Sequence, residues 1–205
     1  LAGMLARDVI PVVPCQGSVG ASGDLAPLAH MTACMIGVGA CDAPQGRMSA
    51  GEALAAAGLA PATLGPKEGL ALLNGTSFST AQTALALADA ETLLETAEIA
   101  AAMSIEALMG FGDAFIPELH EARGHPGQIA TAANIRRLVE GSRLIDGGIG
   151  RDPVRQPPQD AYSLRCVPQV LGPVRETLAF VRGIVEREIN AATDNPLIFA
   201  DRLPG

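Results

Sequence analysis

The chain has 205 residues, of which 48% are hydrophobic and only 3% aromatic, and it contains no tryptophan. A core filled by Ala, Leu, Ile, Val and Met favours closely packed helices over a sheet, so we expect an all-α fold. The formal net charge of -8 has no attraction for a phosphate backbone, so we expect no nucleic-acid partner.

The first predicted elements lie on either side of a glycine-rich stretch. Residues 1–9 are expected to end a helix, after which two prolines impose an extended segment. A helix is predicted over residues 24–36, because an acidic capping residue begins it and a proline stands harmlessly in its first turn. Glycines and prolines over residues 37–65 predict a surface excursion with one short helix over 49–57.

The rest of the chain is predicted to be mostly helical. Residues 67–108 lack proline and repeat apolar side chains at helical spacing, which predicts one very long helix, or two in line with a break at Asn74-Gly75. Further helices are predicted over residues 126–144 and 173–191, separated by a loop rich in glycine and proline.

Membrane spans, metal sites and disulfides have no support in the sequence. The longest run without a charged residue, residues 69–88, carries several amide and hydroxyl side chains that would be costly in lipid. The four cysteines, Cys15, Cys34, Cys41 and Cys166, show no zinc-ligand spacing. We therefore expect reduced thiols in a cytoplasmic protein, and no metal.

The strongest motif is the tripeptide Ala21-Ser22-Gly23 within GSVGASGDLAPLAH, residues 17–30. Three small residues alone indicate only a turn. The whole fourteen-residue context, however, closely resembles the signature of the histidine and aromatic amino-acid ammonia-lyases. This resemblance implies that the tripeptide cyclises to 4-methylidene-imidazol-5-one, and that the protein uses no metal or diffusible cofactor.

Backbone chemistry explains why the ring needs these residue types. The amide nitrogen of Gly23 can attack the carbonyl carbon of Ala21, and loss of two waters, one from the Ser22 hydroxyl, leaves an exocyclic methylidene. Glycine at 23 removes the Cβ that would obstruct this approach. A helix that begins near Asp24 would aim its free N–H groups at the ring carbonyl, where negative charge accumulates during the reaction.

Two other segments resemble the same family and supply amide side chains. Residues 65–79 match the motif whose Asn, here Asn74, is expected near the ring and the substrate amine; the alternative is an Asn-Gly helix cap. Residues 188–199 match the motif whose last Asn, here Asn195, lies near the ring, although Asp-Asn-Pro is also a routine helix stop. The segment around His125 matches too, but the start of a helix explains it, and we assign His125 no chemical role.

Residues 159–170, with the sequence QDAYSLRCVPQV, are the second strong match. The resemblance implies that Arg165 binds the substrate carboxylate, for which its planar fork of donors is well matched. It also implies that Gln159 and Tyr162 lie beside the ring and the substrate. The alternatives are a surface ion pair for Arg165 and an amphipathic interface residue for Tyr162. Ala161 stands where many histidine lyases have proline.

The resemblance implies a bundle of long helices in which residues 1–205 are the central part of one ammonia-lyase catalytic domain, without its N- and C-terminal regions. It implies a cytoplasmic homotetramer that converts L-histidine to urocanate and ammonia, with active sites that combine residues from three subunits. The chain alone would then be inactive or nearly so. Two alternatives remain open: a tyrosine or phenylalanine ammonia-lyase or aminomutase, and a non-catalytic helical assembly module.

Overall fold

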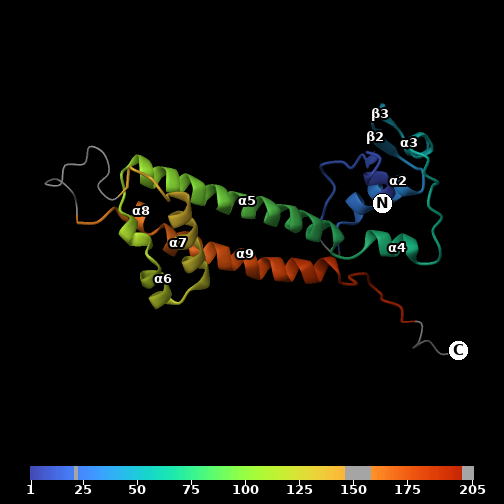
Figure 1. Cartoon of the computed structure of the whole chain (residues 1–205). Coiled ribbons are helices and arrows are strands. Elements are labelled where there is room, and N and C mark those ends of the chain that lie inside the picture. The colour runs from blue at the N-terminus through green and yellow to red at the C-terminus, as the bar shows by residue number, and fades with distance from the viewer. Residues whose placement is uncertain (21–22, 146–157, 200–205) are drawn as a thin grey trace. The chain divides into compact units, whose positions relative to one another are not determined.

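The computed structural model describes residues 1–20, 23–145 and 158–199. The chain divides into two compact units, one of Leu1–Thr83 with Arg187–Gly205 and the other of Ala84–Glu186 (Figure 1). Most described residues are helical, which confirms the expected all-α class. Over the described ranges, no helix is both long and apolar enough to cross a membrane.

The first unit combines short helices with a small antiparallel sheet of order β1-β2-β3. Its elements are α1 (Ala2–Leu5), β1 (Ile10–Pro11), α2 (Leu25–Met35), β2 (Ala40–Ala43), β3 (Gly46–Ser49), α3 (Ala50–Ala56), α4 (Glu68–Leu73) and the start of α5 (Ser77–Ala107). The core contains two buried free thiols, Cys34 and Cys41, packed with Val9 and Leu54. Burial raises the pKa of the Cys41 thiol to about 12, so this thiol stays protonated.

Local sequence signals account for the starts and ends of these helices. Ser49 and Glu52 form a reciprocal capping box at the start of α3, which confirms the helix expected there. The break expected at Asn74-Gly75 is present, because α4 ends at Leu73 and α5 begins at Ser77. The helix predicted over residues 24–36 is also present as α2.

The role expected of Asp24 in helix capping needs a correction. Asp24 is the N-cap residue of α2, but its side chain caps no helix N–H. Its carboxylate instead accepts a hydrogen bond from the Ser18 hydroxyl and another from the Gly20 N–H, at 3.2 Å. The nearly buried Asp24 therefore holds the preceding glycine-rich loop rather than the helix.

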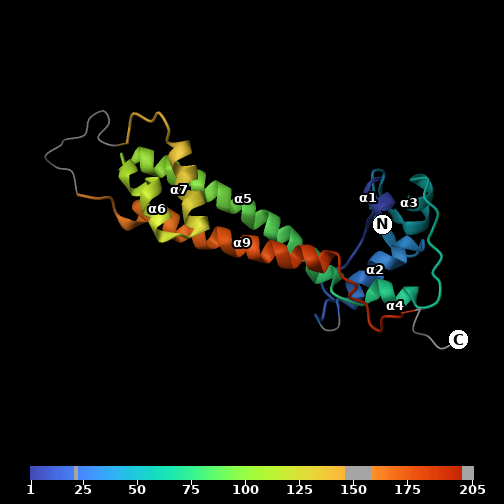
Figure 2. The same ribbon diagram turned by 60° about the horizontal axis from the view of Figure 1, so that its bottom comes forward.

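The second unit is built on the rest of α5 and most of α9 (Val167–Ile189), which lie side by side (Figure 2). Between them in the chain come η1 (Gly112–Phe115), α6 (Pro117–Arg123), α7 (Pro126–Leu138) and α8 (Tyr162–Arg165). Ile105, Phe115 and Ile135 are the largest side chains of its apolar core. This core joins α5, η1 and α7.

Two predicted helices of this unit have different bounds. The helix predicted over residues 126–144 ends at Leu138, before Gly141 turns the chain with a φ of 74°. The helix predicted over 173–191 begins six residues earlier, at Val167, and contains Pro173 in its interior. The residue before this proline is Gly172, which lacks the Cβ that normally clashes with a proline ring. The helix can therefore pass through Pro173.

His120, on α6, is a buried histidine held in its neutral form. Its side chain is 1% exposed. Gln128 Nε2 lies 2.9 Å from His120 Nδ1, so Nδ1 accepts, and Nε2 then donates to the Ala114 carbonyl at 3.0 Å. Burial lowers the pKa of His120 below its ordinary value of 6.5.

This histidine predicts a loss of stability in mild acid. Below about pH 6.5 the unfolded chain binds a proton that folded His120 does not, so the free energy of unfolding falls as the pH drops. Urea unfolding at pH 7.5 and 5.5 should show a larger loss for the wild type than for His120→Gln, which cannot titrate. Equal losses in the two proteins would contradict the assignment.

Candidate functional site

A polar cavity of about 390 Å³ in the first unit brings together segments that are far apart in the sequence. Its walls come from the loop before α2, the break between α4 and α5, and the residues that follow α9. They include Gly23, Asp24, Asn74, Gly75, Thr193 and Asn195. Three residues predicted for the site, Gly23, Asn74 and Asn195, therefore lie around one cavity.

Gly23 occupies a position that no other residue fits. Its φ is +88°, in the left-handed region that L side chains rarely adopt. A Cβ placed there would lie 2.2 Å from the carbonyl oxygen of Gly75 and 2.9 Å from its nitrogen. The requirement for glycine at 23 thus has two physical causes, the backbone angle and the backbone of Gly75.

Gly75, like Gly23, lies against the backbone of another segment, here that of Thr193. Its φ is +99°, and an added Cβ would lie 2.5 Å from Thr193 Oγ1 and 2.7 Å from the Thr193 carbonyl oxygen. Thr76 N–H donates to Thr193 Oγ1 over 3.2 Å, and the Thr76 hydroxyl bonds to the Glu188 carboxylate. The three backbones around Gly23, Gly75 and Thr193 therefore pack in direct contact.

Asn74 and Asn195 are joined across the cavity wall. Asn74 is the C-cap residue of α4, and its N–H bonds to the Leu70 carbonyl. Its side chain does not cap the helix, because Asn74 Nδ2 donates to the Asn195 carbonyl at 2.7 Å. The peptide bond from Asn195 to Pro196 is cis. The alternative of a simple Asn-Gly helix cap explains the backbone of Asn74 but not the hydrogen bond from its side chain to Asn195.

An ion pair that the sequence motifs do not predict lies beside these two residues. Lys67 Nζ contacts the Asp194 carboxylate, and both side chains are about one-fifth exposed. The hydrogen bond from Lys67 holds the pKa of Asp194 below its usual range. The two residues lie more than a hundred positions apart, so no local pattern links them.

Residues 21–22 lie outside the described residues, so the structure places neither Ala21 nor Ser22 of the predicted ring. What it does show is compatible with the ring. The residue that must supply the attacking nitrogen, Gly23, is held by the backbone of Gly75 where a side chain cannot fit. The cavity beside it is lined by amide and hydroxyl groups. Asp24 anchors the loop on the other side of the tripeptide.

Gln159, Tyr162 and Arg165 belong to the second unit. Gln159 and Tyr162 are exposed, and Tyr162 begins the short helix α8, which ends at Arg165. The Arg165 guanidinium carbon lies 4.1 Å from the centroid of the Tyr162 ring. The Nε of Arg165 is buried without a hydrogen-bond partner among the described residues.

The segment that carries these side chains is tied to the N-cap residue of η1, Phe111. The Asp160 carboxylate accepts a hydrogen bond from the Phe111 N–H at 2.6 Å. Asp160 follows Gln159 in the chain and directly precedes Ala161, the N-cap residue of α8. The contact therefore links the residues before α8 to the start of η1.

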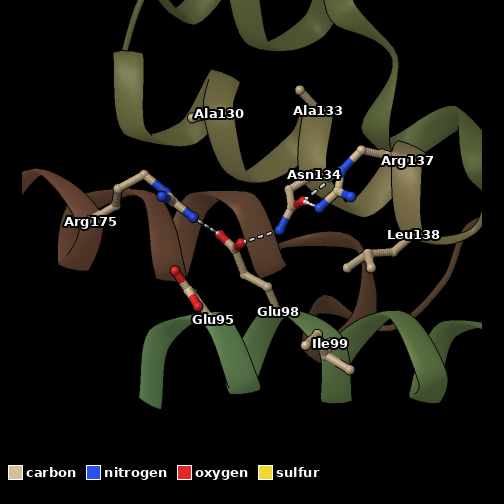
Figure 3. A pocket seen from close by; sticks show the side chains of 9 residues that line it. All are labelled: Glu95, Glu98, Ile99, Ala130, Ala133, Asn134, Arg137, Leu138 and Arg175. Atoms are coloured by element: carbon tan, nitrogen blue, oxygen red, sulfur yellow. Dashed lines mark hydrogen bonds and ion pairs between the residues drawn. The ribbon is translucent and has the colours of Figure 1, made fainter. Parts of the chain in front are cut away.

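A larger cavity, of about 590 Å³, lies in the second unit and has a structural explanation (Figure 3). Glu98 is fully buried and accepts from Arg175 at 2.7 Å, Asn134 at 2.5 Å and Thr131 at 2.7 Å. Arg137 in turn donates to the Asn134 side chain. The three donors satisfy the Glu98 carboxylate, as a buried charge requires, and the contacts join α5, α7 and α9.

No group of three or more His, Cys, Asp or Glu side chains is placed to hold a metal within residues 1–20, 23–145 and 158–199. Backbone, amide and hydroxyl groups line the smaller cavity. The carboxylate of Asp24 is committed to the neighbouring loop.

Comparisons with known proteins agree on one family. The family model described as aromatic amino acid lyase matches residues 1–204. A histidine ammonia-lyase of Anaeromyxobacter sp. (strain K) is 53% identical over 98% of this chain and 41% of its own length.

Solved structures give the same result. The crystal structure of histidine ammonia-lyase from Trypanosoma cruzi is similar with a TM-score of 0.81 and 38% identity, over 98% of this chain and 36% of that one. A tyrosine aminomutase from Streptomyces globisporus has a TM-score of 0.83 and 39% identity, over 98% and 41%. The chain thus spans about two-fifths of the length of these relatives.

Proposed function

This chain belongs to the aromatic amino acid lyase family, and on that premise we propose that the complete protein eliminates ammonia from L-histidine to give urocanate. Relatives about half identical to this chain carry the name histidine ammonia-lyase. The observation that carries the proposal is the meeting of Gly23, Asn74 and Asn195 around one cavity. These residues come from three separate motifs of the ammonia-lyase resemblance.

The prosthetic ring is proposed to form from Ala21, Ser22 and Gly23. Cyclisation needs the Gly23 nitrogen close to the Ala21 carbonyl carbon, and the absence of a Cβ at 23 permits this tight bend. When formed, 4-methylidene-imidazol-5-one supplies the electron sink that a poor ammonium leaving group and a weakly acidic β-hydrogen require. Asn74 and Asn195 are placed to offer amide groups beside Gly23.

Arg165 is proposed to bind the substrate carboxylate. A guanidinium offers a planar fork of donors that matches a carboxylate with two parallel hydrogen bonds. Its Nε is buried without a hydrogen-bond partner among the described residues, and its guanidinium lies against the Tyr162 ring. Tyr162 and Gln159 lie on the same segment and have exposed side chains.

We also propose that the complete protein self-associates, as a homotetramer by resemblance, and works in the cytoplasm. Large apolar side chains are exposed along α9, including Val170, Val174, Phe180, Ile184 and Ile189. Exposed apolar residues gathered on one long helix are typical of a surface that another chain covers. Free buried thiols in the core fit a reducing compartment.

The test uses the complete protein with L-histidine, L-tyrosine and L-phenylalanine as separate substrates. Ammonia release should be fastest with L-histidine, and the peptide that contains residues 21–23 should lack the mass of two waters. Ser22→Ala should lose the mass deficit and reduce ammonia release by at least roughly 10³-fold, since the electrophile carries the chemistry. Ser104→Ala, which removes an exposed hydroxyl on α5, serves as the control and should retain both.

The other outcomes separate the alternatives. Faster reaction with L-tyrosine or L-phenylalanine would assign the protein to another activity of the same family, such as that of the aminomutase with a TM-score of 0.83. Full peptide mass without ammonia release would instead favour a non-catalytic helical module.

A further inference from the structure

The Asp194 carboxylate is the centre of a polar network beside the cavity of the first unit. Lys67 forms an ion pair with it and the Asn195 N–H donates to it over 2.7 Å, while the Asn74 side chain donates to the carbonyl of the same Asn195. The Lys67 and Asp194 side chains are only 21% and 20% exposed, so solvent screens this pair less than a surface pair. Both residues, Asn74 through its side chain and Asn195 through its backbone, belong to the cavity wall.

Lys67 has a backbone conformation that few residues adopt. Its φ is +69°, and among the described non-glycine residues only Asp8 and Met109 also have a positive φ. Such a conformation is unfavourable for an L residue with a long side chain, and it persists where the surrounding contacts hold it. Lys67 is the N-cap residue of α4, and its ion pair with Asp194 is the contact that holds its side chain.

The helix α4 is consequently tied to one dipeptide at both ends. At its start Lys67 contacts Asp194, and at its end Asn74 donates to the Asn195 carbonyl at 2.7 Å. A helix of six residues is only about 9 Å long, so these two contacts with consecutive residues restrain both of its ends. When the contact between Lys67 and Asp194 is broken, Asn74 and Asn195 lose this restraint on their positions.

We propose that Lys67 and Asp194 form a positioning pair that sets the two amides, Asn74 and Asn195, in the geometry that the reaction needs. Neither Lys67 nor Asp194 is among the residues that line the cavity. The inference rests on the proposed function only in that it gives these two amides a task in catalysis. Their placement by the pair stands on the contacts of Asp194 alone.

The chain should still fold when the pair is lost. The hydrogen bond from the Thr76 N–H to Thr193 and the contact between Thr76 and Glu188 also hold this segment, and neither involves the pair. These two contacts remain in Lys67→Met and Asp194→Asn, and the side chains of the pair are one-fifth exposed rather than fully buried. Small misplacements of positioning groups, in contrast, strongly reduce turnover.

The test uses Lys67→Met and Asp194→Asn in the complete protein. Each variant should lower kcat by roughly 10- to 100-fold through misplacement of the amides. KM should change by less than about threefold, and the two-water mass deficit should remain. The double variant should be no slower than the worse single variant, because both changes break one contact. Lys67→Arg should recover most of kcat.

Asp42→Asn is the matched control, since it breaks an ion pair with Arg47 in the same unit in which the side chains are 52% and 64% exposed. It should leave kcat and KM unchanged. A second measurement does not depend on activity: in Lys67→Met and Asp194→Asn, hydrogen exchange in the peptide over residues 190–199 should become faster than in the wild type. Asp42→Asn should leave that exchange unchanged.

A kcat within twofold of the wild type in Asp194→Asn, additive losses in the double variant, or unchanged exchange over residues 190–199 would each overturn the positioning role. Loss of the mass deficit would overturn it too, because the pair would then serve ring formation. If the wild type releases no ammonia from any of the three amino acids, the proposed function has failed. The exchange measurement still decides whether the pair positions the amides.

Discussion

Replacing Gly23 with alanine is expected to prevent ring formation and to reduce ammonia release by at least roughly 10³-fold, since the residues that build the electrophile act as a unit. An added Cβ would lie 2.2 Å from the Gly75 carbonyl oxygen, far inside any real contact distance. The obstacle is backbone rather than a flexible side chain, so the loop before α2 must move. The left-handed φ of +88° adds a second penalty.

The matched control for Gly23→Ala is Gly58→Ala. Gly58 has a φ of +66° in the same unit, but an added Cβ would meet nothing within 4 Å. This variant carries the strain of a left-handed alanine without the clash, and it lies outside the cavity. Peptide mass and ammonia release should therefore change in Gly23→Ala alone. A full two-water deficit in Gly23→Ala would show that the contact with Gly75 does not control cyclisation.

The helical framework could be predicted from the sequence because its signals are local. Proline and glycine limit α2 and separate α4 from α5, and apolar spacing over residues 67–108 shows a long helix. The three short strands could not be predicted in this way, since two to four residues are too few to establish alternation. The seven-residue helix α6 was missed for a similar reason.

Recognition of the site depended on motifs rather than on periodicity. Gly23, Asn74 and Asn195 are named by three segments that the family resemblance connects, and the fold brings them to one cavity. The ion pair of Lys67 with Asp194 belongs to no such pattern, because it arises only when the segment after α9 returns to α4. Contacts of this kind depend on the tertiary fold, which a reading of local sequence does not supply.

Glu98, in the second unit, is another residue whose contacts local sequence does not predict. In the sequence it is one acidic residue on a long helix, where an exposed position is the ordinary expectation. In the structure it is fully buried because three donors from α7 and α9 surround its carboxylate. Nothing within α5 itself indicates that these donors converge there.

Replacement of either glycine at the contact between α7 and α9 should cause a large loss of stability. An alanine Cβ at Gly127 would lie 2.2 Å from the Gly172 carbonyl oxygen, and one at Gly172 would lie 2.5 Å from the Gln128 nitrogen. Alanine normally stabilises a helix relative to glycine by about 1 kcal/mol. Here the two helix backbones are in contact, so each substitution should instead destabilise the protein by roughly 3 kcal/mol, as overpacking does.

Gly→Ala normally raises the free energy of unfolding of a helical protein, whereas at positions 127 and 172 it should lower it, so a control at an uncrowded helical glycine tests the explanation. Gly51→Ala in α3 is the control, because its added Cβ would lie at an ordinary contact distance, 3.5 Å from the Gly37 carbonyl oxygen. Urea unfolding should show a lower free energy for Gly127→Ala and Gly172→Ala, and an equal or higher one for Gly51→Ala. The double variant should lose less than the sum of the single losses, since either change already separates the helices. Stabilisation by alanine at 127 or 172 would mean that α7 and α9 do not cross in backbone contact.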